Sequence, residues 1–132
     1  MPMLMQDFIS HAVQLLQHLH KHQDAIQTES MLVKSLGISR TTFYRIANRL
    51  RRTGLLISGL DGNRGYALGK PVHEISFYEV FIAVEGEPRL RPSLRGAPGY
   101  TEMDNREIHK FLQAVQDNMI AEMSDKCIVD LA

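Results

Sequence analysis

The sequence has little or none of several residue types on which particular protein classes depend. Among its 132 residues there is one cysteine, Cys127, which excludes an intramolecular disulfide framework and a zinc site made of several cysteines. There is no tryptophan, and aromatic residues make up only 7%. Hydrophobic residues make up 44%, which is enough for a folded domain whose core relies on Leu, Ile, Val and Met.

Long apolar runs and the motifs of catalysis are missing as well. No stretch approaches the ~18 apolar residues that a membrane-spanning helix needs. Residues 1–19 lack the basic start and the cleavage site of a secretory signal. There is no glycine-rich phosphate loop, no nucleophile motif and no identifiable base for Cys127. We therefore expect a cytoplasmic protein that is not an enzyme.

Charge is balanced overall but is divided unevenly along the chain. The formal net charge is zero. Residues 1–70 hold nine Lys and Arg against four Asp and Glu, a net +5, whereas residues 71–132 hold six against eleven, a net −5. The segment 30–60 has six basic residues and no acidic one. A polyanion would be attracted to that segment; the alternative is a solvated basic face.

Three helices are predicted in the first half of the chain. Apolar residues recur at helical spacing over 3–22. A second helix is predicted over 28–36, capped by its first residue, and Gly37 follows where helices commonly end in a left-handed residue. A third helix is predicted over 39–53, with Ser39 as its N-cap. Two helices joined by a short turn that contains glycine are typical of a helix-turn-helix.

The third predicted helix divides into two faces. Phe43, Ile46, Ala47 and Leu50 follow the spacing of a core face. The opposite face is polar but contains no glutamate, whereas an ordinary exposed helix would pair Glu with Lys. Arg and Asn bond to base edges, and Thr and Tyr reach phosphates or thymine methyl groups. We therefore predict a DNA-recognition helix rather than a solvated one, with the DNA-binding residues Ser39, Arg40, Thr41, Thr42, Tyr44, Arg45, Asn48, Arg49 and Arg52.

A β-hairpin is predicted directly after this helix. Residues 55–58 form one strand candidate and residues 66–68 the other, with the turn dipeptide Asp61-Gly62 between them. Arg64, near the tip, is a candidate to enter a DNA minor groove or to bind a phosphate. The hairpin would then be the wing of a winged helix; the alternative is a surface hairpin with an incidental arginine.

The second half is predicted to hold two further helices. The first begins at Ser76, which with Glu79 fits a capping box. Residues 87–103 are rich in Pro, Gly and Arg and have no periodicity, so a long loop is expected there. The last helix, over 104–124, carries an apolar seam that we expect to pair with the same helix of a second chain. The alternative is that the seam packs on the chain's own core. The seam consists of Ile108, Phe111, Leu112, Val115, Met119, Ile120 and Met123.

These elements predict a mainly α fold with a small β-hairpin, in which a winged helix-turn-helix domain precedes a long C-terminal dimerisation helix. We expect the DNA-binding domain over 1–86, the loop over 87–103, and the dimerisation helix with a short docked tail over 104–132.

Candidate metal ligands are sparse. His18 and His22 stand four apart on the first helix, which suits a metal, but no matching carboxylate or cysteine lies nearby. We favour surface histidines there. A cluster held by Asp7, His11 and Cys127 is a further alternative that we do not favour, and no metal or cofactor is expected.

Several short motifs occur in this order along the chain: Gly37-Ile38-Ser39, Leu50 with Gly54-Leu55-Leu56, Gly65 to Lys70, and Ile75 with Ala83-Val84-Glu85-Gly86. A Gly-Tyr-x-Leu wing followed by a helix that ends in Glu-Gly is fairly specific in combination, although each piece alone is weak. On these residues the chain as a whole resembles the Rrf-type (IscR/NsrR-like) family of bacterial winged helix-turn-helix regulators.

The resemblance implies a homodimer whose last helices cross and whose third helices enter successive major grooves of a partly palindromic operator. Cluster-binding members of the family look to have three cysteines in the loop before the last helix, and residues 87–103 contain none. His109 lies near the place of a histidine ligand, but one histidine cannot hold such a cluster. The chain therefore resembles members that respond to a protein partner or another effector, which by analogy would be sensed at this loop.

Together these features predict a sequence-specific DNA-binding transcription regulator, a repressor, that binds double-stranded DNA as a homodimer. The alternative is a winged-helix protein-interaction module that has lost DNA binding. Cys127 is predicted to be a bystander rather than a redox switch.

Overall fold

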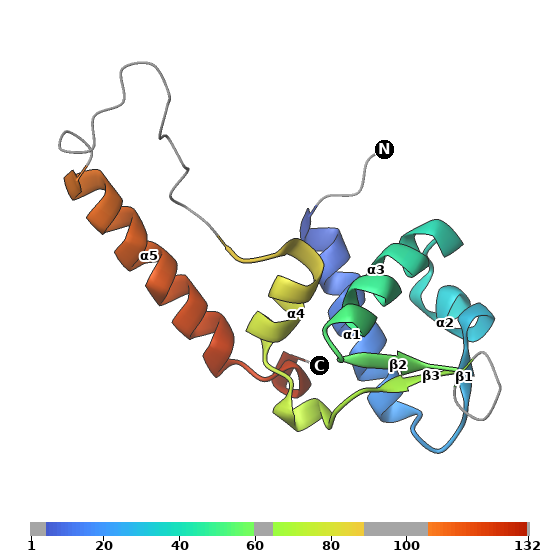
Figure 1. Cartoon of the computed structure of the whole chain (residues 1–132). Helices are drawn as coiled ribbons and strands as arrows, with labels where there is room; N and C mark the ends of the chain where they lie inside the picture. Colours follow the sequence, from blue (N-terminus) through green and yellow to red (C-terminus); the bar gives the residue numbers. More distant parts are fainter. Residues whose placement is uncertain (1–4, 60–64, 89–105, 132) are drawn as a thin grey trace.

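Helices α1, α3 and α4 surround one hydrophobic core, and α5 extends away from it (Figure 1). The computed structural model describes residues 5–59, 65–88 and 106–131, and of residues 5–7 the backbone alone. The predicted mainly helical fold with a small sheet is confirmed. Along the chain the elements are α1 (Met5–Lys21), β1 (Gln27–Thr28), α2 (Glu29–Leu36), α3 (Arg40–Arg52), β2 (Leu56–Ser58), β3 (Gly65–Leu68), the 3-10 helix η2 (Val72–Glu74), α4 (Phe77–Glu85), α5 (Arg106–Asp125) and the 3-10 helix η3 (Ile128–Leu131).

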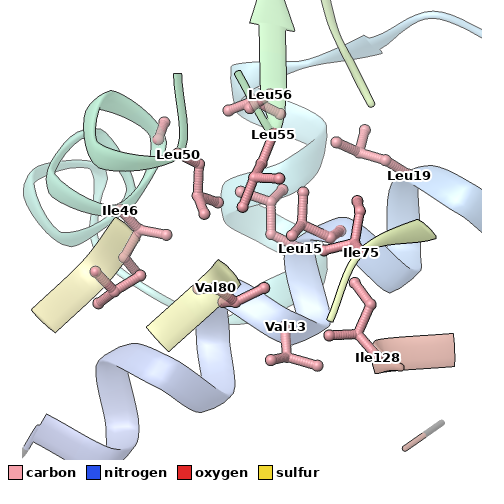
Figure 2. Close-up of a cluster of buried hydrophobic side chains, with 14 of the residues drawn as sticks. Val13, Leu15, Leu19, Ile46, Leu50, Leu55, Leu56, Ile75, Val80 and Ile128 are labelled. Carbon is pink, nitrogen blue, oxygen red and sulfur yellow. The ribbon is translucent and has the colours of Figure 1, made fainter. Parts of the chain in front are cut away.

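The core is filled by aliphatic side chains and by one aromatic ring of α3. Leu15 and Leu16, from the predicted apolar stripe of α1, have no exposed surface. Phe43 is also fully buried, and its ring meets that of Tyr66 edge-on at 5.3 Å between centroids. Figure 2 shows apolar side chains from several elements meeting in one cluster, among them Leu50 and Val80. Burying one large apolar side chain contributes ~1.5–3 kcal/mol, so this cluster holds α3 against α1 and α4.

The corner between α2 and α3 is fixed by local hydrogen bonds. Thr28 caps α2, because its hydroxyl accepts from the Met31 amide at 3.4 Å. Gly37 adopts a left-handed φ of 67°, and its N–H donates to Val33 O at 3.0 Å, which ends α2 as predicted. Ser39 then caps α3 by accepting from the Thr42 amide at 3.1 Å. The predicted helix-turn-helix is therefore present.

The hairpin gains a third strand that the sequence did not suggest. β2 and β3 pair antiparallel as predicted, and β1 pairs with the other edge of β3, giving the order β1-β3-β2. β1 has only two residues, too few for an alternating pattern to show. Gly65 lies at the crowded end of this pairing, where a Cβ would stand 2.6 Å from the Cγ2 atom of Ile26. The predicted turn lies within 60–64, outside the described residues.

The C-terminal tail docks beside the start of α4, as predicted. Ile128 is fully buried, and its N–H donates to Ile75 O at 3.0 Å. Ser76 caps α4 by accepting from the Glu79 amide at 3.1 Å. The second half of the predicted capping box is wrong, because the Glu79 carboxylate pairs with the Lys70 ammonium group at 2.8 Å instead.

The last helix does not return to the core. None of the 20 residues of α5 is buried, and the side chains of Ile108 and Phe111 are 56% and 67% exposed. The alternative of a seam packed on the chain's own core is therefore not what the structure shows. The predicted cap of this helix and most of the predicted loop lie outside the described residues. Within the described ranges, no helix is long and apolar enough to span a bilayer.

The junction between the hairpin and α3 generates a stability prediction. The Gly69 N–H donates to Leu55 O at 2.9 Å, and a Cβ at Gly69 would fall on the carbonyl group of Gly54. Backbone atoms cannot move aside as a side chain can, so we expect Gly69→Ala to lower the free energy of unfolding by about 3 kcal/mol.

Gly37→Ala is the matched control, because Gly37 has a left-handed φ but no atom within 4 Å of a new Cβ. This variant should lower the free energy of unfolding by about 1 kcal/mol, which is the penalty of placing an alanine in the left-handed backbone conformation. Urea denaturation of both variants measures the difference, and equal losses would contradict the proposed close approach.

Candidate nucleic-acid interface

The outer face of α3 presents basic and polar side chains to solvent. Thr41, Arg45, Asn48 and Arg52 are exposed, while the predicted core face on the other side is buried throughout. Helix α3 carries five arginines and no acidic residue. Arginine forks match guanine edges and phosphates, and an Asn amide matches adenine. The face therefore has the chemistry to bind a DNA duplex.

At the start of α3 the hydroxyl groups are organised by the cap. The Ser39 hydroxyl accepts from the Thr42 amide and donates to the Thr42 hydroxyl oxygen at 3.0 Å. The Ser39 hydroxyl thus both donates and accepts a hydrogen bond within the helix terminus. The Thr42 hydroxyl still has its own proton to donate to a group outside the helix. Helix N-termini favour anions such as phosphate.

Tyr44 and Arg40 are held by a carboxylate from the neighbouring helix. The Tyr44 hydroxyl donates to Oε2 of Glu29, the first residue of α2. Nε of Arg40 lies 3.5 Å from Oε1 of the same carboxylate. The hydrogen bond to Glu29 is the main reason that the pKa of Tyr44 lies above its usual value. Burial and then the charge of Glu29 raise the pKa of Tyr66, which lies beneath this group.

Arg49 differs from the other arginines on the predicted list. Its Nη1 donates to Val84 O at 2.6 Å, near the end of α4, and its guanidinium carbon lies 5.9 Å from the centroid of the Phe8 ring. The side chain is half-buried against the body of the protein. Its charge is already engaged inside the fold, so we leave Arg49 out of the proposed interface.

A groove adjoins the C-terminal half of α3. It has a volume of about 530 Å³ and runs between the helix and the edge strand β2. Two arginines and two neutral polar groups give it the character of a phosphate-binding surface. Sequence reasoning missed Arg51 and Ser58. The spacing of Arg51, three residues after Asn48, could have revealed it, whereas Ser58 required the position of the strand. The lining residues are Asn48, Arg51, Arg52, Leu56, Ile57 and Ser58.

The wing is described only at its base. The Gly59 N–H donates to Gly65 O at 3.1 Å, which closes the hairpin where its loop begins. Arg64 lies outside the described residues, and its role stays a prediction.

Three titratable residues away from α3, His18, His22 and Cys127, make local contacts. The ring centroids of His18 and His22 are 4.2 Å apart with the ring planes tilted by 41°, and Nε2 of His18 lies 3.3 Å from Oε1 of Gln27. The Cys127 thiol donates to His73 O at 3.0 Å. In the described part of the chain, no three His, Cys, Asp or Glu residues gather as metal ligands. The side chain of Asp7, one member of the alternative cluster, is outside that part.

The chain matches the family model described as "Rrf2: Iron-dependent Transcriptional regulator" over residues 5–132. It is 41% identical over 59 residues to the provisionally named HTH-type transcriptional regulator YffB of Lactococcus lactis subsp. lactis (strain IL1403). That match spans 45% of this chain and 38% of the length of YffB.

Solved structures share the fold over most of the chain. CymR (YrzC), the global cysteine regulator of B. subtilis, has a TM-score of 0.66 at 16% identity, covering 100% of this chain and 97% of its own. IscR of T. potens has a TM-score of 0.65 at 16% identity, covering 94% and 82%. At such identities the likeness establishes the fold alone.

The placement of Arg49 generates a prediction that separates it from Arg45. Arg49→Ala removes a charged donor from a carbonyl group at the end of α4 and a cation from the Phe8 ring. We expect it to lower the free energy of unfolding by about 2 kcal/mol. Arg45→Ala is the control, since Arg45 is exposed and its removal should leave stability unchanged. Thermal unfolding followed by circular dichroism measures both, and equal melting temperatures would show that Arg49 has no structural role.

Proposed function

The chain belongs to the Rrf2 family of transcription regulators, and from that premise we propose that it is a sequence-specific repressor that binds a partly palindromic operator as a homodimer. The observation that carries the proposal is the outer face of α3. Its exposed side chains are basic or polar, free of acidic residues, and continuous with the arginine-lined groove beside β2.

Two kinds of contact are proposed for this face. Arg45 and Asn48 project from the middle of α3, where a helix inserted in the major groove meets base edges. Arg51, Arg52 and Ser58 line the groove and would follow the phosphate backbone. Phosphate contacts supply affinity and register, and base contacts supply sequence preference.

The proposed dimer rests on α5. A helix of 20 residues is ~30 Å long, and this one leaves Ile108, Phe111 and Val115 of its apolar seam exposed in the single chain. Pairing with α5 of a second chain would bury that seam at the two-fold axis. The proposed division of the chain is therefore a DNA-binding domain over 1–86, a connection over 87–103 and a dimerisation segment over 104–132.

Such a dimer would carry two α3 helices into major grooves one helical turn, ~34 Å, apart. Two-fold symmetry in the protein then requires half-sites related by two-fold symmetry in the operator. A dimer bound to promoter DNA would keep RNA polymerase from binding the same stretch of DNA. This steric exclusion is the physical basis for proposing repression.

The DNA-binding proposal predicts a strong effect of reversing one charge. Arg45→Glu should weaken binding to a preferred duplex at least tenfold, because a base-edge contact is lost and a negative charge meets phosphates. The measurement is a fluorescence-anisotropy titration at several salt concentrations, on DNA from upstream of the chain's own gene and on random duplex.

Lys110→Glu is the control, since it makes the same charge change on α5, where Lys110 pairs with Glu107 at 3.7 Å on the surface. Wild-type protein should prefer one duplex and show a steep salt dependence. Failure to bind either duplex at low salt would refute the DNA-binding proposal and favour a protein-interaction module.

The dimer proposal predicts that a charge on the seam separates the chains. Phe111→Glu should yield a monomer, because a carboxylate cannot be buried without a partner. Ala121→Glu is the control, since Ala121 is exposed and lies opposite the centre of the seam around the helix axis. Sedimentation equilibrium gives the mass of each variant. A wild-type chain that is already monomeric at micromolar concentration would overturn this part of the proposal.

A further inference from the structure

The carboxylate of Glu29 reaches two side chains of the proposed DNA-binding face. Glu29 follows the cap residue Thr28 at the start of α2, and its side chain is only 14% exposed. Oε2 accepts the hydrogen bond of the Tyr44 hydroxyl, and Oε1 lies 3.5 Å from Nε of Arg40. The position suits a carboxylate, because a helix N-terminus and a guanidinium group both attract negative charge.

This contact decides what the Tyr44 hydroxyl can offer to DNA. A phenol has one proton to donate, and in this structure the proton points to Glu29. The oxygen that remains accessible can only accept. Phosphate oxygens also only accept, so Tyr44 cannot bond a phosphate without breaking its bond to Glu29.

Base edges in the major groove provide the complementary group. Adenine presents the N6 amino group there and cytosine presents the N4 amino group, and both are donors. Tyr44 is 43% exposed and stands beside Arg45 on α3, so its oxygen is available to a duplex that approaches this helix. Arg40, whose side chain is 69% exposed, keeps its outer nitrogens for phosphate or guanine.

We propose that Glu29 is a positioning residue that fixes Tyr44 as a hydrogen-bond acceptor, and that Tyr44 thereby reads the amino group of one adenine or cytosine in each half-site. The inference rests on the proposed function, since it assigns one base-pair preference within the same interface. Glu29 also places a negative charge near the phosphates, which lowers affinity for DNA of any sequence. The contact therefore favours selective over general binding.

The experiment starts from duplexes that the wild-type protein selects from a randomised DNA library. At each conserved adenine or cytosine, the base is replaced by purine or 2-pyrimidinone, which lack the amino group. Removing the amino group that Tyr44 reads should weaken wild-type binding about tenfold, within the usual cost of one altered base pair. Tyr44→Phe should weaken binding to the parent duplex about tenfold, should show no further loss on that substituted duplex, and should bind random DNA as the wild type does.

Variants of Glu29 test the positioning role. Glu29→Ala frees the Tyr44 proton, so binding to random DNA should rise about threefold to tenfold while the preference at that base pair is lost. Glu29→Gln keeps an oxygen that accepts the phenol proton, so it should retain the preference although the charge is gone. Glu122→Ala, which removes an exposed carboxylate from α5, should change neither. Circular dichroism confirms that each variant is folded.

The outcomes distinguish failure of the proposed DNA-binding function from failure of the role assigned to Tyr44 and Glu29. If the wild-type protein selects no sequence, the proposed function fails and this inference fails with it. If a motif is selected but Tyr44→Phe weakens binding equally on that motif and on random DNA, with a smaller salt dependence, Tyr44 is a phosphate donor and this inference alone is overturned. A motif whose preferences are unchanged in both Tyr44→Phe and Glu29→Ala would overturn it as well.

Discussion

Burial of one side of α3 is the constraint on which the rest of the proposed interface depends. Phe43, Ile46 and Leu50 are each at most 1% exposed, and together they fix the rotation of the helix about its own axis. Successive residues of a helix are ~100° apart, so a slip of one position would turn Arg45 and Asn48 toward the side of the helix. Arg49 adds a second restraint, because its bond to Val84 O ties the same helix to the end of α4. The orientation of the side chains of the proposed interface is thus determined by contacts on the other side of the helix.

The distribution of charge along α3 also matters before any DNA is bound. Arg49, Arg51 and Arg52 all lie in the last turn, where the C-terminal end of the helix dipole favours cations. The attraction between these arginines and the helix dipole offsets part of the repulsion between neighbouring guanidinium groups. At the other end the cap consists of neutral hydroxyl groups, and Glu29 supplies the negative charge from α2. The helix can therefore keep a strongly basic outer face without losing its own stability.

Much of the fold could be predicted because it follows from local rules. The caps Thr28, Ser39 and Ser76, and the left-handed Gly37, are short-range features that the order of residues specifies directly. The core face of α3 follows from spacing alone. The two-residue strand β1 could not be predicted, since its partner lies 39 residues away at Tyr66 and pairing at that distance leaves no local pattern.

The candidate site also combines features that the sequence predicts with features that it does not. Exposure of Arg45, Asn48 and Arg52 follows from helical periodicity, and the structure agrees with it. The inward turn of Arg49 depends on the end of α4, and the hold of Glu29 on Tyr44 depends on the angle between two helices. Both are contacts between elements, which residue spacing does not encode.

The pairing of β1 with β3 connects two parts of the molecule that the chain separates. Thr28 stands opposite Gly65, at the point where the hairpin loop rejoins the sheet. The same Thr28 caps α2, and Glu29 follows it directly. The base of the hairpin is therefore joined to the first turn of α2 through the two residue pairs of β1 and β3. Because Thr28 is both paired with Gly65 and the cap of α2, a displacement of the hairpin base would also displace the first turn of α2, where Glu29 holds the Tyr44 hydroxyl.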